Sequence, residues 1–245
     1  MLLSMFHILV AMHIVTGSIG AVTFWIPVLG RKGGVKHRRW GRVFTTSLII
    51  TGSLAMLMSL LTLYGPLETH PHLVGQFDAS FVRDIFGWMM LTTGLLTVNL
   101  AWYGWLTIQN KSRQELNRTP LNMGLQFALI PVSLNCAAQG WLIGQPLMYG
   151  MATVGLATAA TNLWFLSKEK PGPADWTKEH LKALVGAGIS VYTAFMAFGS
   201  VRLIPELALH PAMWAIPLTV GIAIILWHWR TVDRQYANRI RYSSA

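Results

Sequence analysis

The chain alternates between long apolar runs and short polar connections. A helix of about twenty apolar residues, at about 1.5 Å per residue, crosses a hydrocarbon layer of about 30 Å. Seven such runs predict membrane-spanning helices at residues 4–29, 43–65, 81–107, 121–143, 146–167, 182–204 and 211–229. The first run lacks the basic residues that open a signal peptide, so we expect it to remain as a helix. The pattern predicts an all-α polytopic membrane protein, with residues 1–245 forming one seven-helix bundle.

Basic residues gather on one side of the predicted membrane. If the N-terminus lies outside, all of the 19 Lys and Arg residues except Arg83 and Arg202 fall on the cytoplasmic side. Short cytoplasmic loops of membrane proteins carry this excess of Lys and Arg. The charge pattern therefore predicts an N-terminus outside and a C-terminus in the cytoplasm.

Composition supports the membrane assignment and narrows the partners. Charged residues make up 11% of the chain, against about 25% in soluble proteins. The net charge of +10 is spread over several connections and the C-terminus rather than one soluble domain, so no nucleic-acid partner is expected. The basic segment 30–44 is expected to contact the anionic head groups of the lipid bilayer.

Uncharged amide side chains lie inside the third, fourth and fifth predicted helices. They are Asn99, Gln126, Asn135, Gln139 and Asn162. Amides at this depth commonly hydrogen bond between helices. The alternative is that they line a polar path for a transported molecule.

Histidines carry the strongest functional signal. Five of the eight fall on the predicted outer side, namely His7, His13, His70, His72 and His210. The other three fall among basic residues at cytoplasmic helix ends, where structural roles are expected: His37, His180 and His228. The outer group is therefore the predicted site.

His13 is the most informative of the outer histidines because it lies within the first predicted helix. It shares an i, i+4 stripe with Gly17 and Ala21, and small residues mark the faces where membrane helices pack. His13 should therefore point into the bundle. Ionisable residues within a membrane are candidates for function, and a neutral imidazole binds a metal without bringing charge into the membrane.

The connection "ETHPHLVGQFD" offers a second group of ligands. Pro71 disfavours helical geometry at His70, and in an extended segment His70 and His72 would face the same way and could chelate one ion. Other outer residues would complete the shell: Glu68, Asp78, His7 or His210. Imidazole suits Zn, Cu, Fe and Ni. The alternative is a hydrated loop whose histidines touch only water and lipid.

Residues 13–44, "HIVTGSIGAVTFWIPVLGRKGGVKHRRWGRVF", resemble the start of a group of bacterial multi-pass membrane proteins of uncharacterised function. Members have a His, a Gly and a Pro in the first helix and an H-R-x-x-G-R first cytoplasmic loop. The matching residues are His13, Gly17, Pro27, His37, Arg38, Gly41 and Arg42. The resemblance implies a multi-pass protein of the bacterial cytoplasmic (inner) membrane and no particular reaction.

A redox cofactor or a transition metal near the outer face is the function that the sequence favours. The architecture is analogous to b-type cytochrome bundles, although the second to sixth helices have no central His to hold a transmembrane pair of haems. A single outer haem b would be ligated by His13 and by one of His7, His70, His72 or His210. The expected role is electron transfer with quinol or a periplasmic protein, or metal handling.

Enzymatic activity is not indicated, because the chain contains no H-E-x-x-H, G-x-S-x-G or phosphate-cradling G-x-x-x-x-G-K motif. The alternatives to cofactor binding are an accessory subunit of a larger membrane complex and a small-molecule transporter.

Overall fold

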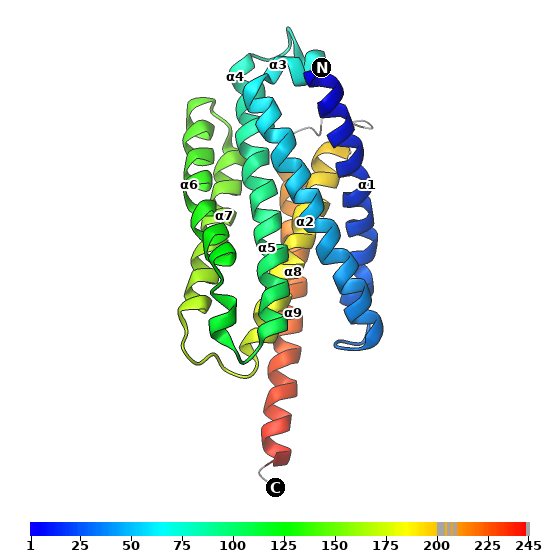
Figure 1. Cartoon of the computed structure of the whole chain (residues 1–245), viewed down its shortest axis with the longest axis vertical. Coiled ribbons are helices and arrows are strands. Elements are labelled where there is room, and N and C mark those ends of the chain that lie inside the picture. The colour runs from blue at the N-terminus through cyan, green and yellow to red at the C-terminus, as the bar shows by residue number, and fades with distance from the viewer. Residues whose placement is uncertain (200–203, 205–206, 208–209, 244–245) are drawn as a thin grey trace.

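The structure is a computed structural model that describes residues 1–199, 204, 207 and 210–243, with side chains up to residue 238. All secondary structure in these residues is helical, which confirms the all-α prediction. The long helices run side by side and form an elongated bundle (Figure 1). Arg202 lies outside the described residues.

Six helical segments of the described chain are long and apolar enough to cross a membrane. They are α1 (Leu2–Leu29), α2 (Val35–Tyr64), the continuous helix Ala79–Asn110, α6 (Pro120–Leu142), the continuous helix Asp175–Gly199, and α9 (Pro211–Ser243). A further helix, α7 (Pro146–Ser167), has 22 residues, but its Gly, Thr and Asn residues make it less apolar. It packs along α6.

Two of the continuous helices contain a turn of π-helix. Ala79–Asn110 consists of α4 (Ala79–Val82), the π-helical η2 (Arg83–Met89) and α5 (Met90–Asn110). Asp175–Gly199 consists of α8 (Asp175–Ala194) and the π-helical η4 (Phe195–Gly199). Short helical turns fill the connections: α3 (Pro66–Thr69), η1 (Pro71–Leu73) and η3 (Gln114–Asn117).

Three helices are longer at the basic end than hydropathy predicted. α2 begins at Val35 rather than at residue 43, α8 begins at Asp175 rather than at residue 182, and α9 continues to Ser243 rather than ending at residue 229. Hydropathy finds the part of a helix that is apolar enough for lipid, whereas Lys, Arg and Glu continue a helix readily in water. The expected loop 30–42 is therefore a short turn followed by two basic turns of α2.

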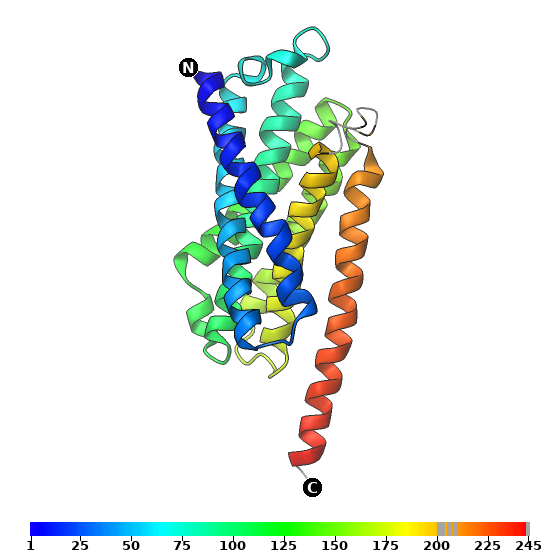
Figure 2. The ribbon, with the colours of Figure 1, turned by 90° about the vertical axis from the view of Figure 1, so that its right-hand side faces the viewer.

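The helix α5 lies at the centre of the bundle. It packs on α2, α6, α7 and α8, while α1 packs on the far side of α2 and α9 packs along α8. The α5 side chains of Leu96, Ala101 and Tyr103 are buried in the main apolar core with Phe44 and Leu48 of α2. Figure 2 shows α1 and α9 on either side of α8.

The closest contact between α2 and α5 is a crossing of two glycines. A Cβ atom added to Gly52 would lie 2.9 Å from the carbonyl oxygen of Gly94, and one added to Gly94 would lie 3.0 Å from the carbonyl oxygen of Gly52. Backbone atoms cannot withdraw as the end of a flexible side chain can. Glycine is therefore required at both positions for the two backbones to approach this closely.

We expect Gly52→Ala and Gly94→Ala to destabilise the bundle by forcing α2 and α5 apart. Overpacking of this kind costs about 1–3 kcal/mol, which lowers the Tm of a protein of this size by several degrees. Gly124→Ala in α6 is the matched control, because a Cβ atom there meets nothing within 4 Å. Thermal unfolding in detergent would contradict the crossing if all three variants had the same Tm.

Candidate functional site

His13 lies on the side of α1 that faces α2. Its side chain is half-buried, and its Nδ1 is 3.0 Å from the backbone carbonyl oxygen of Thr51. A carbonyl oxygen only accepts hydrogen bonds, so Nδ1 carries the proton and Nε2 is the atom that remains for a ligand. The imidazole thus points into the bundle, as its stripe with Gly17 predicted.

The segment that carries His70 and His72 is not extended, so that prediction is wrong. His70 leaves the helical region (φ −126°, ψ 59°) as a residue before proline should, but Pro71 then begins the 3₁₀ turn η1. His70 is buried, with its ring centroid 5.1 Å from that of Phe6 and 4.5 Å from that of Phe86. Burial, followed by the charge of His72, lowers the pKa of His70 to about 4. His70 is therefore neutral at physiological pH.

His72 lies beside His70, but no third predicted outer ligand joins the two in the described part of the chain. His72 is exposed, with its ring centroid 5.9 Å from that of His70. The remaining candidates are exposed as well: His7, Glu68, Asp78 and His210. Asp78 lines a hollow of about 400 Å³ in the surface of the loop, and Nδ1 of His210 accepts the Ala212 backbone N–H at the start of α9. Among the described residues, no group of three or more His, Cys, Asp or Glu side chains is placed to hold one metal ion.

The buried amides bond to one another between three helices. The side-chain nitrogen of Asn162 in α7 donates to Asn99 of α5 (3.3 Å) and to Gln126 of α6 (3.1 Å). All three side chains are fully buried. Gln126 continues the network by donating to Asn122 (3.4 Å). This arrangement favours the interpretation that the amides join helices rather than line a path.

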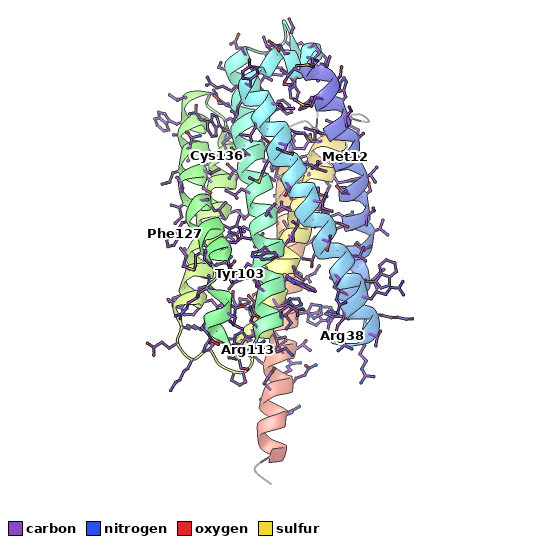
Figure 3. All side chains as sticks on the ribbon, in the orientation of Figure 1. Met12, Arg38, Tyr103, Arg113, Phe127 and Cys136 are labelled. Atoms are coloured by element: carbon purple, nitrogen blue, oxygen red, sulfur yellow. The ribbon has the colours of Figure 1, made fainter. Side chains whose placement is uncertain are left out.

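A larger cavity lies at the opposite end of the bundle from the His70 loop, where α1 ends and α2 begins. Its volume is about 460 Å³, and it is lined by α1, α2, α5, α8 and α9 with the turn between α1 and α2. This volume falls within the range of about 300–1,000 Å³ that is typical of small-molecule sites. We call this cavity the basic pocket. Figure 3 shows Arg38, one of its lining residues, at this end of α2.

Positive and ionisable side chains distinguish the basic pocket from the rest of the molecule. Its cationic lining residues are Lys32, Arg38, Arg42 and Lys111, and its histidines are His37, His180 and His228. The described residues that line it include no Asp or Glu. None of the four cations forms an ion pair with a carboxylate in the described part of the chain. The pocket therefore carries a net positive charge that the protein itself does not neutralise.

Two carboxylates that adjoin lining residues in the sequence, Glu179 next to His180 and Asp233 next to Val232, are engaged outside the pocket lining. Glu179 accepts the hydroxyl of Tyr103 (2.7 Å) and pairs with Lys182 (2.6 Å). Asp233 pairs with Lys178. Each carboxylate is thus held by a cation that does not line the pocket.

Backbone hydrogen bonds fix two of the pocket histidines. Nδ1 of His180 lies 2.8 Å from the carbonyl oxygen of Gly104, and Nδ1 of His37 lies 3.2 Å from that of Pro27. Both Nδ1 atoms must therefore carry a proton, which leaves each Nε2 for a ligand. The two ring centroids are 6.4 Å apart. The end of α1 also binds Lys32, whose ammonium donates to the carbonyl oxygens of Pro27 (2.9 Å) and Val28.

Sequence reasoning gave these inner histidines structural roles only, and so missed the pocket. The hydrogen bonds of His37 and His180 show that they do have such roles. The absence of acidic residues from the basic segment 30–44 is the signal that could have indicated the pocket. That segment was interpreted as a contact for lipid head groups, because the sequence did not show that α5, α8 and α9 enclose it.

Comparisons of the chain with protein-family models, with curated proteins and with solved structures found no match.

Proposed function

We propose that the protein binds an anionic ligand in the basic pocket. The observation that carries this proposal is a cavity of about 460 Å³ with four Lys and Arg side chains and three histidines in its lining and no carboxylate. Cations that share one cavity repel each other, and an anion removes that repulsion while it gains charge-assisted hydrogen bonds. Arg38 and Arg42 are suited to phosphate or carboxylate because a guanidinium binds these groups through two parallel hydrogen bonds.

Within this proposal the bundle is the scaffold and not a channel. Mutual hydrogen bonding of Asn99, Gln126 and Asn162 at full burial supports an accessory or ligand-binding subunit over a transporter with a polar central path. The sequence suggested three kinds of partner: quinol, a periplasmic protein and other membrane subunits. They remain proposed partners of such a subunit.

We expect an anion to raise the Tm of the protein in a neutral detergent. A ligand at 100 times its Kd stabilises the folded state by about 2.7 kcal/mol, which is several degrees in Tm. Pyrophosphate and dodecyl phosphate are suitable probes. The double variant Arg42→Ala with Lys111→Ala should lose the increase, whereas Lys170→Ala, which removes an exposed cation outside the pocket, should keep it. No increase with either probe, or the same increase in both variants, would refute the proposal.

We further propose that all seven long helices span the membrane, with the N-terminus outside and the basic pocket at the cytoplasmic side of a bacterial inner membrane. The positive end of the bundle supports this orientation, because short loops on the cytoplasmic side of a membrane are rich in Lys and Arg. It also places the pocket beside the anionic lipids of the inner leaflet.

A membrane-impermeant thiol reagent tests this topology in intact cells. Cys136 is buried, so single cysteines report on their own positions. Cysteine at the exposed positions Val35 and Lys170 should be protected until the cells are opened, whereas cysteine at the exposed Val74 should react at once. Reaction of Val35→Cys in intact cells would contradict the orientation. Reaction of Lys170→Cys alone would contradict the helix count, because Lys170 follows α6 and α7.

Metal or haem binding near the outer face is the second candidate function. It is favoured by the 5.9 Å between the ring centroids of His70 and His72. At a metal–nitrogen distance of about 2.1 Å, two imidazoles on one ion have centroids within roughly 6 Å of each other. The neutral His70 is in the protonation state that a metal requires, and His13 on α1 would have to supply a further ligand from deeper in the bundle.

The visible spectrum and the metal content of the purified protein test the second candidate. If a metal or haem is bound, a His70→Ala/His72→Ala variant and His13→Ala should each lower the content several-fold. His228→Ala at the other end of the bundle is the control. A colourless and metal-free wild-type protein, or unchanged content in the variants, would eliminate this candidate.

A further inference from the structure

The lining of the basic pocket changes from polar to apolar along the bundle axis. Lys32, Arg38 and Lys111 lie near the turns at the ends of α1, α2 and α5. Farther into the bundle the lining is Phe24, Phe44, Leu184 and Val185. In the proposed topology this gradient runs along the bilayer normal, with charge at the surface and hydrocarbon toward the midplane. A purely hydrophilic anion would leave the inner part of such a pocket in contact with water.

The apolar part is continuous with the packed core rather than a detached surface patch. Phe24 and Phe44 are both almost completely buried, with ring centroids 5.5 Å apart. A Cβ atom added to Gly188 of α8 would lie 2.7 Å from Phe24 Cδ2. These rings have almost no exposed surface and form the closed floor of the pocket, whereas the half-buried Ile108, Leu181 and Leu184 supply its apolar walls.

The pocket walls α1 and α9 both contact α8, but α1 packs mainly on α2 and α9 packs mainly on α8 (Figure 2). The bond from Trp229 Nε1 to the carbonyl oxygen of Lys178 (3.1 Å) holds α9 to α8 at the level of the pocket. The lipid-facing side between α1 and α9 is thus where a hydrocarbon chain would enter.

Four cations favour a phosphate head group over a carboxylate, because a phosphate monoester carries up to two negative charges and offers three acceptor oxygens. The Nδ1 atoms of His37 and His180 carry the ring proton, so each Nε2 is an acceptor and can bind only a P–OH group, as in a phosphate monoanion. The head group would lie between the basic turns of α2 and the end of α5.

We propose that the ligand of the basic pocket is a phosphate-headed amphiphile from the inner leaflet, bound with its head among the basic residues and its hydrocarbon chain along the half-buried Leu181 and Leu184. This inference rests on the proposed anion binding and names its ligand class. Free phosphate and phosphate monoesters without a chain share the head-group chemistry. An affinity that rises with chain length therefore distinguishes an amphiphile from these soluble anions.

A chain-length series measures the contribution of the apolar wall. Kd values for glycerol phosphate, octyl phosphate and dodecyl phosphate are measured by Tm shift in a neutral detergent, and dodecylphosphocholine serves as the probe with the same chain and no net charge. We expect dodecyl phosphate to bind at least 10-fold more tightly than glycerol phosphate and at least 10-fold more tightly than dodecylphosphocholine.

Gly41→Trp is the variant that should block the pocket. Gly41 lines it, and an added Cβ atom meets nothing within 4 Å, so the indole fills space that the ligand would occupy. Gly124→Trp on α6 has the same free space and lies outside the pocket, and it should bind as the wild type does. If Gly41→Trp does not fold, Arg42→Gln replaces it and should weaken dodecyl phosphate more than dodecylphosphocholine.

The outcomes separate the inference from the function on which it rests. Equal affinity for all phosphates, whatever the chain, overturns the amphiphile and leaves anion binding in place. Equal affinity for dodecyl phosphate and dodecylphosphocholine overturns the phosphate head. Absence of binding by every phosphate overturns both, and undiminished binding in Gly41→Trp overturns the location.

Discussion

The close crossing of α2 and α5 at Gly52 and Gly94 is the constraint on which the rest of the structure depends. Helices in lipid gain little from burial of apolar side chains, so packing relies on backbones that approach closely and on hydrogen bonds between helices. The crossing brings the two backbones together near the middle of the bundle. From there α2 leans away from α5 toward the end that carries Arg38 (Figures 1 and 3). The space between the diverging ends becomes the basic pocket once α8 and α9 close its other sides.

Hydrogen bonds between polar side chains also hold the helices of the bundle together. Asn99, Gln126 and Asn162 hold α5, α6 and α7 together, and Glu179 is satisfied by Tyr103 and Lys182. Buried polar groups are stable when their partners are present. The pocket cations Lys32, Arg38, Arg42 and Lys111 are exposed rather than buried, and no carboxylate pairs with them in the described chain. Four cations gathered without a counter-charge make the pocket a candidate for an external anion.

The sequence predicted the helices well because twenty apolar residues in a row have few alternatives. It predicted less about helix ends, since the basic turns at Val35–Arg42 are helical without being apolar. His13 could be assigned to an inward face from its spacing to Gly17. His70 could not be placed, because whether the chain after Pro71 extends or turns depends on packing against Phe6 and Phe86.

The basic pocket illustrates the same limit on a larger scale. His37, His180 and His228 are far apart in sequence and come together only through the arrangement of α2, α8 and α9. Each alone is an unremarkable histidine near a membrane surface. The glycine pair that sets this arrangement, Gly52 and Gly94, stands in segments with no motif that would distinguish it from the other glycines.

Native mass spectrometry of the protein released from its own membrane would detect the bound amphiphile itself. We expect a bound species whose fragments contain phosphate and a hydrocarbon chain, retained in gentle detergent by the wild type and by Gly124→Trp and lost from Gly41→Trp. A wild-type protein without such a species, or a species retained equally by Gly41→Trp, would contradict this expectation.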